Sequence, residues 1–388
     1  MNIELFASLA AELCAHSLVV PGRPLRWTII ANPGAGGFTI SGRWKKHHEA
    51  LKAAVRNACN FNMRREDSRP SQTALGAEAE GNPGGLSALG LVATRHPGHA
   101  GNITGDLLRE AAESAAETTA GTPAAETAGA PFHLVICAGG DGTSLEVLSR
   151  LHNADPALQD NFAVLRLPMG TGNDGADSWQ LAEALELLSR PTDLVRIPAL
   201  RLSTATEAAE GKGPFLAFNI LSVGLDAFVT HMTNKMKGKL PGDSYRLWVD
   251  IASLFYDRIY KVAPMEIQVF AEGGEPRVLH ETPLLLAVGA SGHRTYGSRQ
   301  QILPDDRNAC VIRQMPLLRK LALKKLIMTG SHADQSETLL FNARRVEFRG
   351  REPILAQMDG ETVLLRHEDF PASIELTRPA IQTLKKRA

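Results

Sequence analysis

Residues 137–149 read Cys-Ala-Gly-Gly-Asp-Gly-Thr-Ser-Leu-Glu-Val-Leu-Ser and directly follow the apolar run Phe132–Ile136. Gly139, Gly140 and Gly142 permit positive φ and lack the Cβ atom that would keep a ligand away from the main chain. Thr143 starts a predicted helix, whose N-terminal amides favour an anion. The run therefore predicts a loop that binds nucleotide phosphates, and an ordinary strand-to-helix turn is the alternative.

The same order of strand, loop and helix recurs on both sides of this run. Strands are expected at 27–31, 90–94, 134–138 and 162–167, and helices at 43–59, 104–112, 144–151 and 178–188. Alternating strands and helices predict a parallel sheet covered on both faces. Ligands of such sheets bind beyond the carboxyl ends of the strands. We therefore expect the glycine-rich corners that contain Asn32, Gly36 and Gly170 to meet the first loop at one site.

After Thr192 the chain changes to short strand-like runs with few helices, which predicts a mostly antiparallel β domain. Helices are expected only near 243–256 and 317–328. Residues 1–195 form the expected α/β nucleotide-binding domain and residues 196–376 the β domain. The segments 66–90 and 114–130 are too poor in apolar residues to pack and predict surface insertions.

Composition excludes some classes of protein. The chain has 388 residues with 42 basic and 42 acidic side chains, so no overall field attracts nucleic acid. Its four cysteines form no Cys-x-x-Cys pair, which favours free thiols in a reducing, cytoplasmic compartment. The segment Met1–Val20 lacks a basic start and is interrupted by Glu4 and Glu12, so it predicts an amphipathic helix rather than a signal peptide. No apolar stretch is long enough to span a bilayer.

The corner Gly170-Thr171-Gly172-Asn173-Asp174-Gly175 matches the dinucleotide fingerprint G-x-G-x-x-G, and Asp193 follows about 20 residues later. A Rossmann dehydrogenase is therefore one alternative. That fingerprint belongs to the first βα turn of a Rossmann unit, whereas this corner is the last of several. Thr171 and Asn173 can still donate to phosphate or sugar oxygens. The Walker pattern and the protein-kinase signatures are absent.

Asp359-Gly360-Glu361 places two carboxylates beside a glycine late in the β domain. The pattern is typical of a hairpin turn. As a functional motif, it would make Asp359 the base that takes a proton from a substrate hydroxyl attacking a γ-phosphate, with Glu361 orienting it or helping to hold a metal. The residues alone leave both interpretations open.

Five motifs together resemble the diacylglycerol kinase catalytic family, which includes soluble bacterial lipid kinases and sphingosine kinases. They are Asn32-Pro-Gly-Ala-Gly, Gly139-Gly-Asp-Gly-Thr, Pro168-Met-Gly-Thr-Gly-Asn-Asp, Asn219-Ile-Leu-Ser-Val-Gly-Leu-Asp-Ala and Asp359-Gly-Glu. The resemblance implies an N-terminal α/β domain, a C-terminal antiparallel β-sandwich, ATP in the cleft between them, and a final segment, 377–388, that returns to the first domain. It also implies Mg²⁺, a lipid substrate at a membrane surface, ATP contacts and Asp359 as the base. The expected nucleotide-binding residues are Asn32, Gly36, Thr94, Gly139, Gly140, Asp141, Gly142, Thr143, Gly170, Thr171, Gly172 and Asn173.

Some positions depart from the family pattern. Gly175, Ala176 and Asp177 stand where the family has an aromatic residue followed by Ala-Arg, so a charge changes sign. The loop that holds a structural Mg²⁺ in similar bacterial enzymes is represented by 305–310, with Asp305 and Asn308 as the remaining candidate ligands. Two alternatives stay open: an NAD kinase-like enzyme, which shares Gly-Gly-Asp-Gly-Thr, and a nucleotide-binding regulator without turnover.

A basic segment at 317–328 contains Arg319, Lys320, Lys324 and Lys325 among leucines. Such a helix can rest on an anionic membrane, where each cation contributes ~1 kcal/mol. Lys325 interrupts its apolar stripe, so a solvated helix is the alternative. The protein is thus expected in the cytoplasm or at the periphery of a membrane, and it could form a homodimer.

Overall fold

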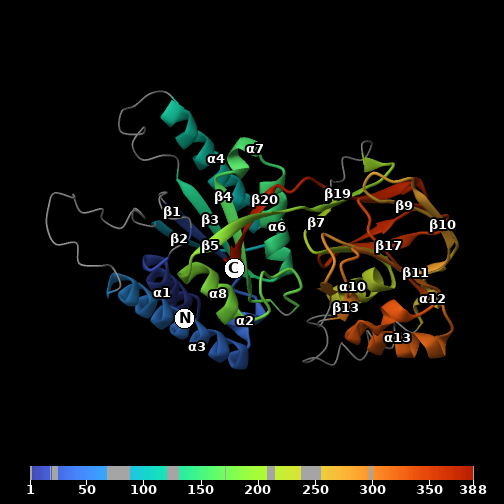
Figure 1. Cartoon of the computed structure of the whole chain (residues 1–388), viewed down its shortest axis with the longest axis horizontal. Coiled ribbons are helices and arrows are strands. Elements are labelled where there is room, and N and C mark those ends of the chain that lie inside the picture. Colours follow the sequence, from blue (N-terminus) through green and yellow to red (C-terminus); the bar gives the residue numbers. More distant parts are fainter. Residues whose placement is uncertain are drawn as a thin grey trace. The chain divides into compact units, whose positions relative to one another are not determined.

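The computed structural model describes residues 2–17, 19, 25–67, 88–119, 131–170, 172–207, 215–236, 255–296 and 300–387. The chain divides into two units, Met1–Ile197 with Ala380–Ala388, and Pro198–Pro379 (Figure 1). The sequence predicts domains at 1–195 and 196–376, with 377–388 returning to the first. Most of each expected insertion, 68–87 and 120–130, lies outside the described residues.

The first unit is built on one six-stranded sheet in the order β2-β1-β3-β4-β20-β5. Its strands are β1 (Leu25–Ala31), β2 (Ala88–Ala93), β3 (Phe132–Gly139), β4 (Phe162–Pro168), β5 (Thr192–Ile197) and β20 (Ile381–Lys386). All neighbours pair in parallel except β20 and β5. Every residue of β3 and β4 is buried, as expected for central strands of a parallel sheet.

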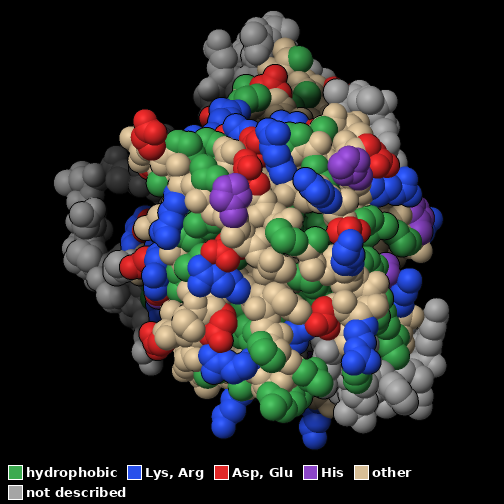
Figure 2. Space-filling view, turned by 90° about the vertical axis from the view of Figure 1, so that its right-hand side faces the viewer, with side chains coloured by type: hydrophobic (Ala, Val, Ile, Leu, Met, Phe, Trp, Pro, Cys, Tyr) green, Lys and Arg blue, Asp and Glu red, His purple; other side chains and the backbone are tan. Residues whose placement is uncertain are grey.

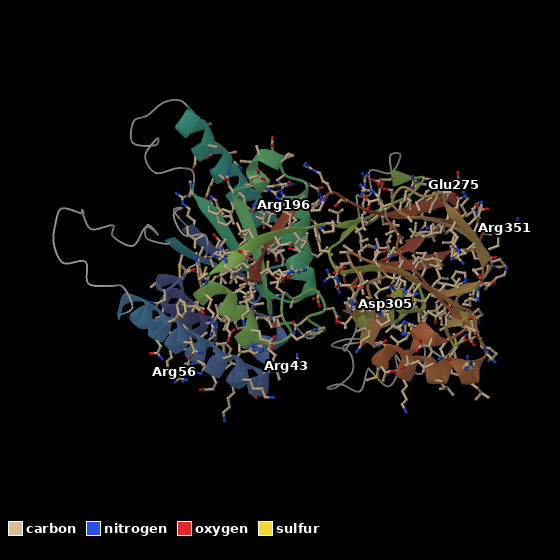
Figure 3. All side chains as sticks on the ribbon, viewed as in Figure 1. Arg43, Arg56, Arg196, Glu275, Asp305 and Arg351 are labelled. Carbon is tan, nitrogen blue, oxygen red and sulfur yellow. The ribbon has the colours of Figure 1, made fainter. Side chains whose placement is uncertain are left out.

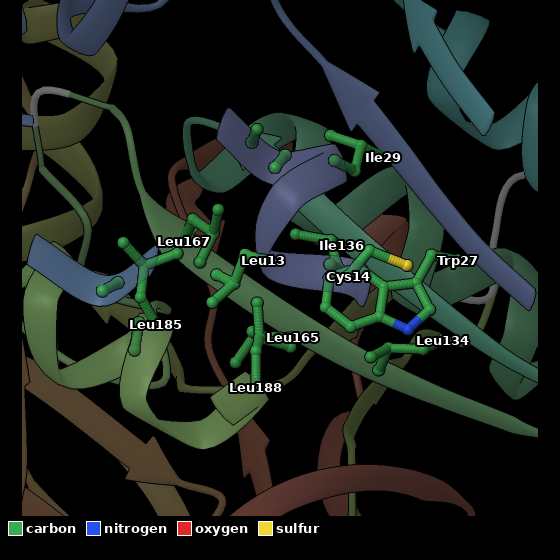
Figure 4. Close-up of a cluster of buried hydrophobic side chains, with 14 of the residues drawn as sticks. Leu13, Cys14, Trp27, Ile29, Leu134, Ile136, Leu165, Leu167, Leu185 and Leu188 are labelled. Carbon is green, nitrogen blue, oxygen red and sulfur yellow. The ribbon is translucent and has the colours of Figure 1, made fainter. Parts of the chain in front are cut away.

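Two groups of helices cover this sheet (Figure 1). One comprises α1 (Asn2–Ala15), α2 (Gly36–Thr39), α3 (Ser41–Asp67) and α8 (Leu181–Ser189), and the other α4 (His99–Thr119), α6 (Asp141–His152) and α7 (Pro156–Gln159). Figure 4 shows the core under α1 and α8, where helix side chains meet those of the strands. Its labelled members are Leu13, Cys14, Trp27, Ile29, Leu134, Ile136, Leu165, Leu167, Leu185 and Leu188.

Several helices are longer than the sequence predicts. Helix α3 continues to Asp67 rather than ending at Cys59, because no glycine or proline intervenes and Met, Arg and Glu favour helices. Residues 88–90 and 114–119, expected in insertions, belong to β2 and α4. Helix α6 begins at Asp141, three residues earlier than expected, so Asp141 and Thr143 lie in its first turn.

The second unit contains two six-stranded sheets whose neighbouring strands pair antiparallel. One has the order β10-β9-β16-β19-β6-β7 and consists of β6 (Leu200–Ser203), β7 (Phe215–Ala217), β9 (Met265–Phe270), β10 (Arg277–Glu281), β16 (Arg345–Arg349) and β19 (Ala372–Leu376). The other has the order β15-β14-β11-β8-β17-β18 and consists of β8 (Ile220–Gly224), β11 (Pro283–Gly289), β14 (Ala309–Arg313), β15 (Thr338–Phe341), β17 (Ile354–Met358) and β18 (Glu361–Leu365). Strands β12 (Arg294–Tyr296) and β13 (Gln300–Leu303) form a small separate pair.

The two large sheets enclose one apolar core, in which Ile267 and Val346 of the first sheet meet Val223 and Val311 of the second. A further core lies on the other face of the second sheet, under α10 (Leu225–Met236), α12 (Tyr256–Ile259) and α13 (Leu317–Thr329). Two short 3₁₀ helices, η1 (Ser331–Asp334) and η2 (His367–Asp369), complete the unit. The predicted combination of a parallel α/β domain and an antiparallel β-sandwich is confirmed.

Most of the helix expected at 243–256 lies outside the described residues, and only α12 is seen at its end. Among the helices in the described ranges, none is both long and apolar enough to cross a membrane.

Candidate functional site

The loops that follow β1, β2 and β3 are joined to one another by hydrogen bonds in the first unit. The Asn32 N–H donates to the Ala138 carbonyl at 3.0 Å, and the Thr94 N–H donates to the Ala31 carbonyl at 2.8 Å. The Asn32 side chain also donates to Thr143 Oγ1 at 3.4 Å. Three corners far apart in the sequence therefore lie side by side at the carboxyl end of the sheet.

Asp141 fastens a fourth loop, the one after β4, to this group. Its Oδ2 accepts from the Asn173 N–H at 3.1 Å, and its Oδ1 accepts from the Gly175 N–H at 3.0 Å. Asn173 has a left-handed φ of 62° and its Oδ1 accepts from the Gly170 N–H at 2.6 Å. Because both Asp141 oxygens accept from backbone amides, this carboxylate holds two loops together in the described structure.

Two glycines in these loops are required by close approach of the chain. A Cβ on Gly139 would lie 2.6 Å from Thr143 Oγ1, and a Cβ on Gly170 would lie 2.7 Å from the Gly140 Cα. Gly140 itself is different. It is extended (φ −92°, ψ −176°) at the N-cap of α6, and its Cβ would meet nothing closer than 3.7 Å. A Cβ on Gly140 would therefore collide with no neighbour, at the amide end of a 12-residue helix.

The remaining residues expected to bind nucleotide are found in or beside these loops. Gly36 begins α2, and Gly142 lies with Thr143 in the first turn of α6. Gly172 is exposed next to Asn173, while Thr171 lies outside the described residues. Their contact with a nucleotide stays a prediction.

Two charged residues near these loops were missed by sequence reasoning. Arg43, in the first turn of α3, donates from Nη1 to the Gly170 carbonyl at 3.3 Å and places a cation beside the loop after β4 (Figure 3). Glu146 of α6 accepts from the N–H groups at the start of α4, at 2.7 Å from Gly98 and 3.0 Å from Ala100. A basic residue just after the first glycine-rich corner could have indicated Arg43. Nothing local in the sequence indicates the contacts of Glu146.

In the second unit, the Asp359 carboxylate is held by backbone amides. Its oxygens accept from the N–H groups of Phe218 at 2.5 Å, Asn219 at 3.1 Å and Ile220 at 2.9 Å. Asp359 has a left-handed φ of 45° in the turn between β17 and β18. The hairpin and the functional motif predicted for Asp359-Gly360-Glu361 are therefore compatible, because the turn itself presents the carboxylate.

These three backbone amides restrict the orientation of the Asp359 carboxylate. A carboxylate has about four acceptor positions, and three amides occupy most of them. The amides therefore determine the orientation of the Asp359 carboxylate. Glu361 begins β18 and is exposed. Its part in orienting Asp359 stays a prediction.

A buried polar cluster lies under the same turn. Ser222 Oγ donates to Asp226 Oδ2 at 2.5 Å, and Gln357 Nε2 donates to Ser222 Oγ at 2.9 Å. Gln357 Oε1 then accepts from the Gly360 N–H at 3.1 Å, next to Asp359. Burial raises the pKa of Asp226 to about 7, and the hydrogen bonds from Ser222 and Gln357 oppose that rise.

The raised pKa of Asp226 predicts a pH dependence of stability. The folded state keeps the proton up to about pH 7, whereas an unfolded aspartic acid loses it near its ordinary pKa of 3.8. Between these values the folded state binds more protons, so stability falls as pH rises from about 4 to 7. At ~1.4 kcal/mol per pKa unit, the loss is on the order of 4 kcal/mol. Urea unfolding of the wild type and Asp226→Asn from pH 4.5 to 8 measures this. Parallel profiles of the two proteins would rule out Asp226 as the titrating group.

The loop at 305–310 contains Asp305 and Asn308, the candidate ligands of the predicted Mg²⁺ site. Arg307 Nε donates to both oxygens of Asp305, at 3.0 and 3.1 Å, and its backbone N–H donates to Oδ1 at 2.9 Å. This guanidinium lowers the pKa of the Asp305 carboxyl. The Asn308 side chain is buried and exchanges 2.8 Å hydrogen bonds with the Ala343 backbone. Asp305 is labelled in Figure 3.

Asp305 and Asn308 as arranged do not fit a bound Mg²⁺, because a guanidinium occupies the carboxylate and backbone groups occupy the amide. In the part of the chain that the structure describes, no group of three or more His, Cys, Asp or Glu side chains could hold a metal ion.

The contact of Arg307 with Asp305 predicts that folding does not depend on a divalent cation. EDTA should change the unfolding temperature by less than ~1 °C, because the charge of Arg307 already compensates Asp305. Thermal unfolding with EDTA or with Mg²⁺ measures this. A drop of several degrees with EDTA that Mg²⁺ reverses would show a structural metal site.

Comparison with known families covers the loops of the first unit. Residues 26–197 match the model of the diacylglycerol kinase catalytic domain. Over this range the chain is similar to the diacylglycerol kinase catalytic family. The match contains all four loops that meet at the end of the sheet, and it confirms the resemblance drawn from the motifs.

Proteins of similar sequence and a solved structure of similar fold also resemble this chain. Probable lipid kinases named YegS-like from Xanthomonas axonopodis pv. citri and Xanthomonas euvesicatoria pv. vesicatoria are each 27% identical to the chain, over 64% of it and 79% of their own length. The fold is also similar to the crystal structure of a putative diacylglycerol kinase from Bacillus anthracis. That alignment has a TM-score of 0.52 and 18% identity, and covers 92% of this chain and 96% of the other.

Asp177, the departure from the diacylglycerol kinase pattern, has a structural explanation. Its Oδ1 accepts from Arg166 Nη2 at 2.6 Å, and its Oδ2 accepts from the Arg166 N–H at 2.7 Å. The two side chains are only 9% and 7% exposed. Asp177 therefore ties the end of the loop after β4 back to that strand and compensates a buried arginine.

Removing Asp177 is expected to destabilise the protein strongly. Asp177→Ala leaves the Arg166 guanidinium buried without its carboxylate, a change that costs about 3–5 kcal/mol. Asp160→Ala is the matched control, since its pair with Arg196 is exposed and contributes about 0–1 kcal/mol. Urea unfolding measures both. Equal effects of the two substitutions would contradict this assignment.

Proposed function

We propose that the protein is an ATP-dependent lipid kinase that transfers the γ-phosphate to a lipid hydroxyl, with diacylglycerol as the favoured acceptor. The family match and the relatives named as probable lipid kinases support a kinase. The observation that carries the proposal is the extended Gly140 at the N-cap of α6, where a Cβ would make only ordinary contact at 3.7 Å. This is the arrangement that lets backbone amides approach phosphate oxygens.

Binding and positioning of the nucleotide are assigned to the first unit. The N–H groups at the start of α6 would donate to the phosphates, while Asp141 keeps the loop after β4 in place. Arg43 adds a positive charge beside that loop. The substrate is MgATP, whose Mg²⁺ neutralises part of the triphosphate charge.

Acceptance of the proton is assigned to Asp359. Phosphoryl transfer requires little covalent participation of the protein, so positioning and electrostatics dominate. The amides of residues 218–220 fix the carboxylate orientation before the acceptor arrives. The oriented carboxylate can then receive the proton of a lipid hydroxyl, and Glu361 is proposed to help orient that hydroxyl.

Identification of the acceptor tests the proposal. The protein is incubated with γ-labelled ATP, Mg²⁺ and a total lipid extract, and in parallel with NAD. We expect label in a phospholipid that co-migrates with phosphatidic acid, and none with Asp359→Asn. Label in NADP would instead support the NAD kinase-like alternative. Tight ATP binding with no labelled product from either mixture would support the regulator and contradict the proposed activity.

A further inference from the structure

Helix α13 has a buried side that is polar in part. Lys320, Leu323 and Ile327 point into the second unit. Lys320 is buried and pairs with Asp257 of α12 at 2.8 Å. The leucines of α13 that are not buried therefore lie on the other sides of the helix.

The outward side of α13 carries large apolar side chains. Leu318 is 79% exposed, Leu321 53% and Met328 52%. At 100° per residue, the outward side contains, in order around the helix, Leu318, Lys325, Leu321, Met328, Leu317 and Lys324. Lys325 thus interrupts an apolar stripe that faces solvent rather than the core.

All charged side chains of α13 are basic. Residues 317–329 contain no acidic side chain. Arg319 pairs with Glu337 at 2.6 Å and Lys320 with Asp257. Lys324 and Lys325 are exposed among the outward apolar residues. Long lysine side chains in such positions can place their stems along apolar surface and their ammonium groups at a charged layer.

Helix α12 extends this surface. It is linked to α13 by the pair of Asp257 and Lys320. Phe255 and Ile259 are exposed, and the Arg258 guanidinium lies 5.7 Å from the centre of the Phe255 ring. Figure 2 shows apolar side chains mixed with basic and some acidic ones on the lower part of the molecular face that α13 occupies in Figure 1.

We propose that this α12–α13 surface, formed by Leu317, Leu318, Leu321, Met328, Phe255 and Ile259 with Lys324, Lys325 and Arg258, docks onto an anionic lipid bilayer. Exposed apolar side chains interleaved with cations are the pattern of interfacial helices. A second copy of the chain is disfavoured, because a two-fold contact would bring the lysines of one copy against those of the other. The proposal deepens and rests on the proposed lipid kinase, since docking would bring the enzyme to a bilayer that contains its acceptor.

Sedimentation with vesicles tests the surface. The full chain is mixed with vesicles of phosphatidylcholine alone or of phosphatidylcholine with about 30% phosphatidylglycerol, which is anionic. We expect binding to the anionic vesicles that weakens with salt. Lys324→Ser with Lys325→Ser should weaken it by ~30-fold, at about 1 kcal/mol per cation. Leu318→Ser with Leu321→Ser should weaken it by at least ~10-fold.

Matched controls use exposed residues of the same unit outside this surface. Val278→Ser with Leu364→Ser controls for apolar exposure, and Arg366→Ser with Arg378→Ser for charge. We expect these variants to bind as the wild type does. Wild-type protein that stays in solution with anionic vesicles would overturn the proposal. So would α13 variants that bind normally, or light scattering that shows a dimer abolished by Leu318→Ser with Leu321→Ser.

Activity on a substrate outside a bilayer distinguishes loss of membrane docking from loss of kinase activity. Phosphorylation of a dispersed short-chain diacylglycerol needs no bilayer, so the α13 variants should retain it. Activity on that substrate without vesicle binding would overturn the docking surface alone. Vesicle binding by α12–α13 with no phosphorylation of any lipid would support the surface and contradict the kinase.

Discussion

Asp359→Asn is expected to lower kcat by about 10²–10⁴-fold with ATP affinity changed little. The asparagine cannot accept a proton at neutral pH, which removes the proposed base. ATP affinity should persist because the proposed nucleotide loops belong to the first unit, whereas Asp359 belongs to the second. Steady-state transfer to dispersed diacylglycerol and titration calorimetry with ATP measure the two quantities.

The anchored geometry of Asp359 requires a control for folding. An asparagine would turn its NH₂ group toward amides that now donate to a carboxylate oxygen, at a cost of about 1–3 kcal/mol. The unfolding temperature must therefore be measured with activity. Asp226→Asn is the matched variant, since it also changes a carboxylate to an amide under the same turn and should keep most turnover. Near-normal kcat of folded Asp359→Asn would remove it as the base.

Gly140→Val is expected to weaken ATP binding by at least ~100-fold, equivalent to about 2.7 kcal/mol. Its extended backbone suits valine, and a Cβ there has only ordinary contact, 3.7 Å, with Gly170. The fold should thus tolerate the substitution, and the added methyl groups should occupy the space proposed for phosphate. Calorimetric titration with MgATP and thermal unfolding measure the effect.

A glycine with equal freedom elsewhere controls for this substitution. A Cβ on Gly274 would meet nothing within 4 Å, and Gly274→Val should leave both ATP affinity and unfolding temperature unchanged. Tight ATP binding by Gly140→Val would place the phosphates somewhere other than the start of α6. Gly170→Val is not suitable, since it would collide with the Gly140 backbone.

The fold class could be predicted because its signals are local and periodic. The buried run at 132–136 followed by glycines indicates a strand, a corner and a helix, and the pattern repeats along the first unit. Helix ends were less predictable. Helix α6 begins at Asp141 because Gly140 serves as its N-cap and an acidic residue suits the first turn.

Residue roles in the site were harder to predict, since they depend on contacts across the sequence. Asp141 looked like a neighbour of phosphate, yet its oxygens accept from amides more than 30 residues later. The amides that hold Asp359 lie about 140 residues earlier. By contrast, the partner of Asp177 had a visible signal: Arg166 is a charged residue within the otherwise apolar strand at 162–167. Arg307, two residues after Asp305, was a similar local indication that the loop supplies its own cation.

The most direct test of the central claim is transfer of the γ-phosphate from labelled MgATP to dispersed diacylglycerol by the purified full chain. We predict that label appears in phosphatidic acid and that Asp359→Asn and Gly140→Val each suppress it. Label that stays in ATP, or appears only as inorganic phosphate, would contradict the assignment of this protein as a lipid kinase.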